Sequence, residues 1–225
     1  MYAGRVHVVG LGDSVTAASN CGCTDFITQL AARLPAAIGA PGAADNLGRG
    51  GLTTAGLHDQ VAAAGPARTA LSHAGIVVVT IGANDLNPLV GTWENQGCSS
   101  AGCIRPAVAA MGRGLTADLA LIRAVAPAGA RILVTDYWAV FQDGQVARSL
   151  FGGAFPPWQD EVTRQANAAI CSAARGIDAT CVDLFAPFRG AAGDQDDTQL
   201  LADDGNHPNT AGEAAIVRAL LAALP

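Results

Sequence analysis

A serine, a histidine and an aspartate stand where they could together perform nucleophilic acyl chemistry. Ser14 lies in Gly12-Asp13-Ser14, directly after an apolar segment that predicts a strand. A serine at a strand-to-helix turn can present both its hydroxyl and its backbone N–H. Asp204 and His207 are three residues apart on one predicted loop, so the carboxylate can accept the Nδ1 proton and fix the ring tautomer. These positions predict a nucleophile (Ser14), a general base (His207) and its orienting acid (Asp204).

Two further polar segments also follow predicted strands. One is the glycine-rich Asn46–Thr54, in which backbone can approach a ligand closely, and the other is Ile81-Gly-Ala-Asn-Asp85. The oxyanion of an acyl transfer needs about two or three fixed hydrogen-bond donors. The expected donors are the N–H of Ser14, the N–H of Gly51 and the side-chain amide of Asn84.

The remaining histidines are less suited to the role of base. His7 lies inside a predicted strand, His58 on a helix and His73 just ahead of a strand, so a structural role is expected for each. The serine does not match the G-x-S-x-G hydrolase elbow, because Thr16 replaces its last glycine. Nor is the segment a dinucleotide fingerprint, because Val15 replaces the third glycine.

Short apolar runs alternate with helical patterns along the chain. Strands are expected at Arg5–Gly10, Ala43–Leu47, Gly75–Ile81, Arg131–Asp136 and Ile177–Leu184. Helices are expected from a Thr24 cap to Pro35, after Thr53, over Ile104–Val125, over Val162–Ile170, and from a capping box at Thr210-Ala-Gly-Glu213. Loops are expected at Leu86–Gly102 and Tyr137–Trp158. This alternation predicts a parallel sheet covered by helices on both faces, with ligands beyond the carboxyl ends of the strands.

Composition limits the class of protein. The 225 residues suit one domain, 1–225, and half of them are apolar while 14% are charged, so a large core is expected. The net charge of −6, with only scattered Arg, argues against nucleic acid or an anionic membrane as a partner. No apolar run is long enough to cross a bilayer. The pattern includes no metal or cofactor site, and we expect a monomer.

The four blocks, in this order, resemble the SGNH or GDSL-type hydrolase family. The first block reads Gly-Asp-Ser-Val where the family has Gly-Asp-Ser-Leu. The resemblance implies a three-layer α/β/α, flavodoxin-like fold of about five parallel strands, and ester hydrolysis through an acyl-serine intermediate. Gly51 is chosen because it lies five residues after Asn46, with Gly48 and Gly50 as alternatives. Asp204 is preferred to the adjacent Asp203 for its spacing to His207.

Six cysteines form three local pairs in the sequence: Cys21 with Cys23, Cys98 with Cys103, and Cys171 with Cys181. Their number and spacing predict three disulfides and an oxidising compartment, and the alternative is buried thiols in a cytosolic enzyme. A strand is expected almost directly after Met1, so we expect a mature secreted protein given without its leader.

Aromatic residues gather between Tyr137 and Trp158, where Tyr137 and Trp138 could line an acyl pocket or a sugar platform. The loop with Trp93 could form the opposite wall. Asp194, Asp196 and Asp197 lack calcium-loop spacing, which favours a solvated loop. The interpretation is a serine esterase acting on small-molecule or polymer-borne esters, with short acyl or acetyl esters favoured and lipid esters as an alternative. An acyltransferase with the same site and a catalytically silent carbohydrate-binding protein are also compatible with these residues.

Overall fold

A computed structural model describes residues 4–224, without the side chains of Gln96 and Ser100. Within this range five strands form one sheet in the order β2-β1-β3-β4-β5, and every neighbouring pair is parallel. This is the flavodoxin-like order, in which the chain reverses direction across the sheet at β1 and β3. The strands are β1 (Val6–Gly12), β2 (Gly42–Asn46), β3 (Ile76–Thr80), β4 (Arg131–Thr135) and β5 (Thr180–Val182).

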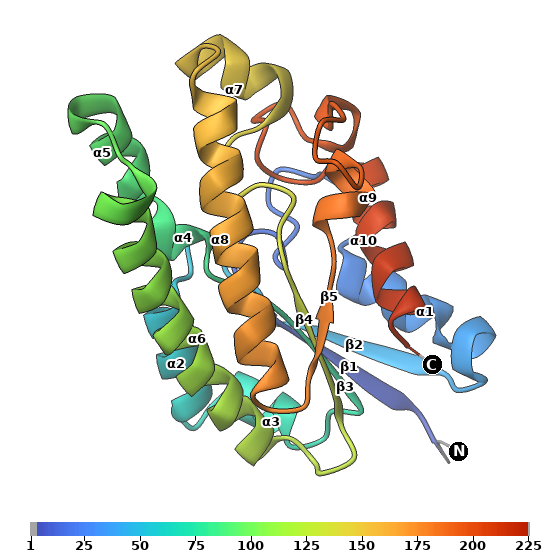
Figure 1. Ribbon diagram of the computed structural model, residues 1–225. Helices are drawn as coiled ribbons and strands as arrows, with labels where there is room; N and C mark the ends of the chain where they lie inside the picture. Colours follow the sequence, from blue (N-terminus) through green and yellow to red (C-terminus); the bar gives the residue numbers. More distant parts are fainter. Residues whose placement is uncertain (1–3, 225) are drawn as a thin grey trace.

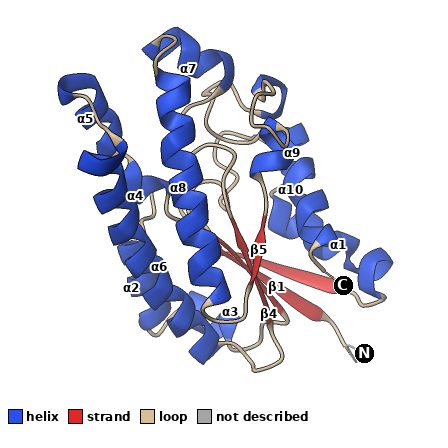
Figure 2. Cartoon of the chain, in the orientation of Figure 1, coloured by secondary structure: helices blue, strands red, loops and turns tan. Residues whose placement is uncertain are grey.

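Helices cover both faces of the sheet, which confirms the expected three-layer α/β/α fold (Figures 1 and 2). On one side α1 packs against β1, β2 and α10, and on the other α6 packs between α2 and α8. The helices are α1 (Phe26–Ile38), α2 (Thr54–Ala62), α3 (Pro66–Leu71), α4 (Ala83–Leu86), α5 (Pro88–Gln96), α6 (Arg105–Val125), α7 (Gly144–Phe151), α8 (Phe155–Arg175), α9 (Phe185–Arg189) and α10 (Thr210–Ala222).

The central strand β3 shows why the sequence folds this way. Its Ile-Val-Val-Val-Thr run is buried along its whole length, as expected for a parallel strand with helices on both faces. On α6 the apolar positions recur at helical spacing, and Met111, Leu115, Leu119 and Ile122 are buried against the sheet and its neighbours. The apolar periodicity therefore places the core and, with it, the strand ends.

Two segments expected as loops contain helices. In the first, α5 begins at Pro88, where a missing backbone N–H costs nothing, and a π-helical turn spans Ser100–Ile104. In the second, α7 is capped by Asp143, and α8 begins at Phe155, ahead of the expected start at Val162. Both expectations were wrong because α5 and α7 bury few apolar positions of their own and are stabilised by tertiary packing.

Two helix starts also differ from expectation. The first helix is capped by Asp25, whose carboxylate accepts the N–H of Thr28, so Thr24 is not the cap. This helix continues through Pro35 to a left-handed cap at Gly39. The last helix is capped by Asn209, whose side chain accepts the N–H groups of its first turn, in place of the expected capping box from Thr210.

Three disulfides join the cysteines in the expected local pairs, Cys21–Cys23, Cys98–Cys103 and Cys171–Cys181. The last one ties α8 to β5. No helix within residues 4–224 is long and apolar enough to cross a membrane.

The acidic segment near residue 196 is only in part the expected solvated loop, because Asp194 and Asp196 are exposed and Asp197 is buried. Asp197 is only 1% exposed, and Asp196 pairs with Arg148. Burial, together with the nearby Asp143, raises the pKa of Asp197 above its usual range, and Arg189 offsets part of this effect. Arg189 bridges the buried Asp143 and the partly exposed Asp160 next to it.

Candidate active site

The loop that carries Ser14 is pressed against the end of the neighbouring strand. Asp13 N–H donates to the carbonyl of Thr80, the last residue of β3, at 3.0 Å. A Cβ at Gly12 would lie 1.9 Å from that carbonyl oxygen, and the φ of Gly12 is +138°. Only glycine tolerates both conditions, so this residue lets the Ser14 loop meet the segment after β3.

The glycine-rich segment after β2 packs on the same loop. The side-chain amide of Asn46 donates to the carbonyl of Thr16 at 2.7 Å, and Arg49 N–H donates to the carbonyl of Gly12 at 2.9 Å. The carboxyl ends of β1 and β2 are thereby joined, and the segment lies beside Ser14 as the sequence predicts.

The three candidate glycines differ in what their backbone N–H groups do. Gly48 N–H donates to Oδ1 of Asn46 at 3.0 Å, so it is already occupied. Within the described residues, the N–H groups of Gly50, Gly51 and Ser14 donate no hydrogen bond. Gly51 has a φ of +74° in the turn closed by the N–H of the next residue, a conformation that suits glycine.

Asn84 follows β3 and is held from two sides. Its amide nitrogen donates to the carbonyl of Leu52 at 2.9 Å, and its Oδ1 accepts from the amide of Asn87 at 3.1 Å. Only one of the two amide hydrogens of Asn84 is used by Leu52. The next residue, Asp85, accepts both the N–H and the hydroxyl of Thr54. The β3 loop is therefore bonded to the segment that contains Gly51.

Asp204 and His207 meet as their spacing predicts. Nδ1 of His207 lies 2.6 Å from Oδ2 of Asp204, and the other carboxylate oxygen accepts the N–H groups of Asn206 and His207 at 2.9 and 3.0 Å. Burial alone would raise the pKa of Asp204, but these bonds outweigh it and lower that pKa to about 2. The carboxylate stays ionised and selects the tautomer of His207 with its proton on Nδ1.

The other ring nitrogen of His207, Nε2, is free to act. It is buried and makes no hydrogen bond within the described part of the chain. With Nδ1 protonated, Nε2 carries a lone pair, and it can accept a proton from a substrate or a nucleophile.

The loop that carries this pair is fixed to the body of the protein. Ala202 N–H donates to the carbonyl of His207 at 2.7 Å, and an isolated antiparallel bridge joins Leu201 to Pro208. Asp143 N–H, at the start of α7, donates to the carbonyl of Gly205 at 2.6 Å. The position of the histidine therefore depends on α7 as well as on α10.

Asn20 contacts the acid–base pair, although no sequence pattern indicates a role for it. Its amide donates to Oδ2 of Asp204 at 2.5 Å and lies 3.4 Å from Nδ1 of His207. Its φ is +60°, a conformation that Asn adopts more readily than most residues, and the Cys21–Cys23 disulfide follows directly. Asn20 links the loop of Ser14 to the acid–base pair across 184 residues.

A small cavity of about 40 Å³ lies beside Ser14. Tyr137 and Trp138 are among the residues that line it, and each is only 1% exposed. The phenol of Tyr137 donates to the buried carboxylate of Asp13 at 2.5 Å. The cavity is lined by Asp13, Ser14, Val15, Ala83, Asn84, Asn87, Tyr137, Trp138, Ala139, Val140 and Asn206.

Trp93 does not lie at this cavity. Its ring stacks on Trp158 and meets the edges of Phe151 and Phe155, so it belongs to a cluster between α5, α7 and α8. Trp93 therefore packs between helices and does not form the expected second wall of the site. The Cys98–Cys103 disulfide lies next to this cluster, where Trp158 donates to the carbonyl of Cys98.

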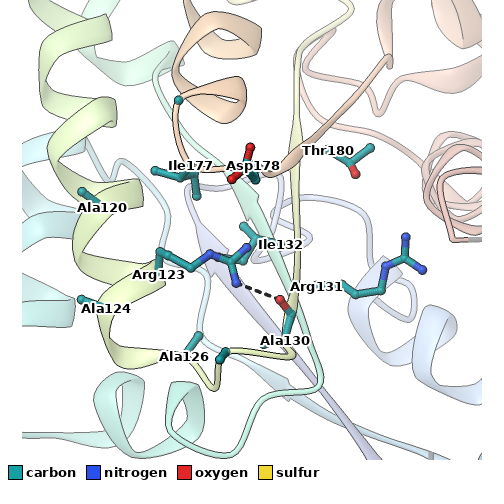
Figure 3. Close-up of a pocket in the computed structure, with 12 residues that line it drawn as sticks. Ala120, Arg123, Ala124, Ala126, Ala130, Arg131, Ile132, Ile177, Asp178 and Thr180 are labelled. Carbon is teal, nitrogen blue, oxygen red and sulfur yellow. Dashed lines mark hydrogen bonds between the residues drawn. The ribbon is translucent and has the colours of Figure 1, made fainter. Parts of the chain in front are cut away.

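A larger hollow of about 960 Å³ lies at the opposite end of the sheet, where β4 and β5 begin (Figure 3). Arg123 crosses it to the carbonyl of Ala130, and five of the twelve lining residues are alanines of α6 and its following turn. Because ligands of such folds bind at the carboxyl ends of the strands, this hollow is separate from the site. Among residues 4–224 no cluster of His, Cys, Asp or Glu could hold a metal ion.

Comparisons with known proteins bear on the family and the fold of the chain. The model of the GDSL-like lipase/acylhydrolase family matches residues 11–215, which span all four blocks. No curated protein matches the chain.

Solved structures share the fold at low sequence identity. The lipase Lip_vut3 from a goat rumen metagenome is 16% identical, with 97% of each chain covered and a TM-score of 0.72. Axe2, an acetylxylan esterase from Geobacillus stearothermophilus, is 16% identical over 99% of this chain and 95% of its own, with a TM-score of 0.68. Phospholipase A1 from Streptomyces albidoflavus NA297 is 23% identical over 96% of this chain and 98% of its own, with a TM-score of 0.66.

Proposed function

Since the chain belongs to the GDSL-like lipase/acylhydrolase family and is a carboxylic ester hydrolase, we propose that it is a serine esterase that cleaves short acyl esters through an acyl-serine intermediate. One observation carries this proposal. Ser14, Asn84 and Asn206 line one small cavity, and Asn206 directly precedes the histidine that Asp204 orients.

In the proposed reaction the same groups act first in acylation of the serine and then in deacylation. Ser14 Oγ attacks the ester carbonyl while Nε2 of His207 takes its proton. The negative oxygen of the tetrahedral intermediate accepts from the N–H groups of Ser14 and Gly51 and from the amide of Asn84. His207 then returns the proton to the leaving alcohol, and the acyl-serine forms. Water repeats the sequence with His207 as base and releases the acid.

The free donors support this assignment. The N–H groups of Ser14 and Gly51 donate no hydrogen bond to any other described residue, so both can bind a substrate oxygen. One amide hydrogen of Asn84 is likewise free, since Leu52 takes only the other. Gly48 is excluded as the glycine donor because its N–H is bonded to Asn46.

The cavity favours a small acyl group. A water needs roughly 10–15 Å³ of such volume, so about 40 Å³ holds on the order of three non-hydrogen atoms. An acetyl group has that number, and a long acyl chain exceeds the volume that residues such as Trp138 and Val140 enclose. The favoured substrates are therefore acetyl and other short esters, on a small molecule or a polymer.

The disulfides bear on where the protein works. Three local disulfides favour an oxidising compartment, which supports a secreted enzyme. The sheet and its two helical layers, which include elements from Val6 to Ala222, support one domain over residues 1–225.

The test is hydrolysis of p-nitrophenyl esters with acyl chains from two to sixteen carbons. Wild-type protein should prefer acetate, and Ser14→Ala should keep its melting temperature while losing turnover. A fluorophosphonate should label the wild type at Ser14 and should not label the variant. Wild-type protein that neither hydrolyses any ester nor reacts with the fluorophosphonate would refute the proposed function.

A further inference from the structure

A buried tyrosine supports the residue just before the proposed nucleophile. Tyr137 follows β4, is 1% exposed, and donates its phenol hydrogen to Oδ2 of Asp13 at 2.5 Å. Asp13 is equally buried and directly precedes Ser14. The proposed acyl transfer uses neither of these polar groups directly, so their burial together needs another reason.

Asp13 holds the backbone on both sides of Ser14. Its Oδ1 accepts the N–H of Val15 at 3.0 Å, and its own N–H donates to the carbonyl of Thr80 at 3.0 Å. The peptide unit between Asp13 and Ser14 carries the N–H that would bind the oxyanion. The direction of that N–H therefore depends on the position of the Asp13 side chain.

Tyr137 is itself firmly held. Its N–H donates to Oδ1 of Asn167 at 3.1 Å, and the amide of Asn167 donates back to its carbonyl at 2.7 Å. Burial, and next the negative charge of Asp13, raises the pKa of Tyr137 well above its usual value, so the phenol keeps its proton. A continuous chain of contacts thus runs from α8 through Tyr137 to Asp13.

We propose that Tyr137 is a positioning residue for the acyl transfer: by holding the Asp13 carboxylate, its hydroxyl fixes the Ser14 N–H as an oxyanion donor. This inference rests on the proposed function. An oxyanion donor acts more strongly in the transition state than on the bound ester, so loss of its alignment lowers kcat and leaves KM nearly unchanged.

The first experiment compares Tyr137→Phe with Thr135→Val, measuring kcat and KM for p-nitrophenyl acetate and the melting temperature. Thr135 is the matched control, because its buried hydroxyl, 2.7 Å from that of Thr80, lies on β4 and is also lost. Tyr137→Phe should lower kcat about 10- to 100-fold with KM within about twofold, the size of effect that a small misplacement produces. Thr135→Val should keep kcat within about twofold. Equal kcat in the two variants would overturn the inference.

A second variant, Asp13→Asn, keeps the shape of the side chain and tests the same contact. If Tyr137 acts through Asp13, Tyr137→Phe should have little further effect on kcat in the Asp13→Asn background, within about threefold. Full additivity of the two kcat losses would overturn the inference, whatever the stability of Tyr137→Phe.

The pH profile gives a readout that a purely structural role would not move. Burial raises the pKa of Asp13 to about 6. The hydrogen bonds from Tyr137 and Val15 and the charge of His207 lower this pKa, and the charge of Asp85 raises it. Removing the phenol should move the acidic limb of the pH profile of kcat to higher pH, and an unmoved limb counts against the inference.

Failure of Ser14 to react with a fluorophosphonate in the wild type would refute the proposed function and this inference together. Normal kcat in Tyr137→Phe would refute the inference alone.

Discussion

Val140 should limit the length of the acyl chain that the enzyme accepts. It is 3% exposed and lines the 40 Å³ cavity beside Ser14, together with Trp138. A butyryl group carries two methylene groups more than an acetyl group. Forcing added methylene groups into a packed site costs about 1–3 kcal/mol. At about 1.4 kcal/mol for each factor of ten, kcat/KM for p-nitrophenyl butyrate should be about 5- to 150-fold below that for acetate.

Val140→Ala removes two carbon atoms from the cavity wall, the number that butyrate adds. Val140→Ala should therefore raise the butyrate-to-acetate ratio of kcat/KM about tenfold, which recovers most of the difference between the two esters in the wild type. The kcat/KM for acetate should change little. The matched control is Val162→Ala, which truncates a fully buried valine of α8 that does not line the cavity. Both variants should lose about 1–3 kcal/mol of stability, judged from truncations of buried aliphatic side chains.

The assay is initial-rate kinetics with p-nitrophenyl acetate, propionate and butyrate, alongside urea unfolding of all three proteins. Equal butyrate-to-acetate ratios in Val140→Ala and Val162→Ala would show that this cavity does not hold the acyl group. A wild type that cleaves butyrate as fast as acetate would refute the volume argument at its first step.

Three further expectations concern other parts of the molecule. Asn84→Ala should lower kcat about 10²- to 10³-fold, the usual loss for one oxyanion donor, and wild-type kcat in stopped-flow or steady-state assays would exclude that role. Asp197→Asn should be more stable than the wild type in urea unfolding at pH 7, because burial raises the folded pKa of Asp197. Above the unfolded pKa, folding of the wild type must therefore take up a proton at Asp197, and this lowers its stability as the pH rises. The difference in stability between Asp197→Asn and the wild type should vanish below about pH 4, where the carboxyl is protonated in both states. Replacing Cys171 and Cys181 by Ser should cost about 2–4 kcal/mol of stability, seen as a lower urea midpoint, and an unchanged midpoint would contradict it.

The sheet and the order of the site residues could be predicted because both depend on local patterns. The buried run of β3 and the helical spacing on α6 can be recognised in the sequence, and parallel strands bring their carboxyl ends to one edge. The meeting of Asp204 and His207 also follows from a spacing of three residues on one loop.

The parts that could not be predicted depend on contacts between distant segments. Asn20 meets Asp204 across 184 residues, and Tyr137 meets Asp13 across 124, so no local signal marks either contact. The helix α7 buries only Gly144 and Ala147, which provides almost no apolar period to recognise. The helix α5 could have been recognised from Pro88, whose place at a first turn is a known start signal.

The pKa values of two carboxyl groups beside the site are shifted in opposite directions, and this difference separates the roles of the two groups. Several hydrogen bonds hold the pKa of Asp204 at about 2, whereas burial raises that of Asp13 to about 6. Environments that shift the pKa values of two acids in opposite directions indicate different roles for these acids in one site. Near pH 5 the Asp204 carboxylate is still charged and bonded to Nδ1 of His207, while Asp13 takes up a proton and weakens its hold on the Ser14 loop. Protonation of Asp13 in mild acid would therefore loosen the oxyanion side of the site while the Asp204 charge that orients His207 is still in place.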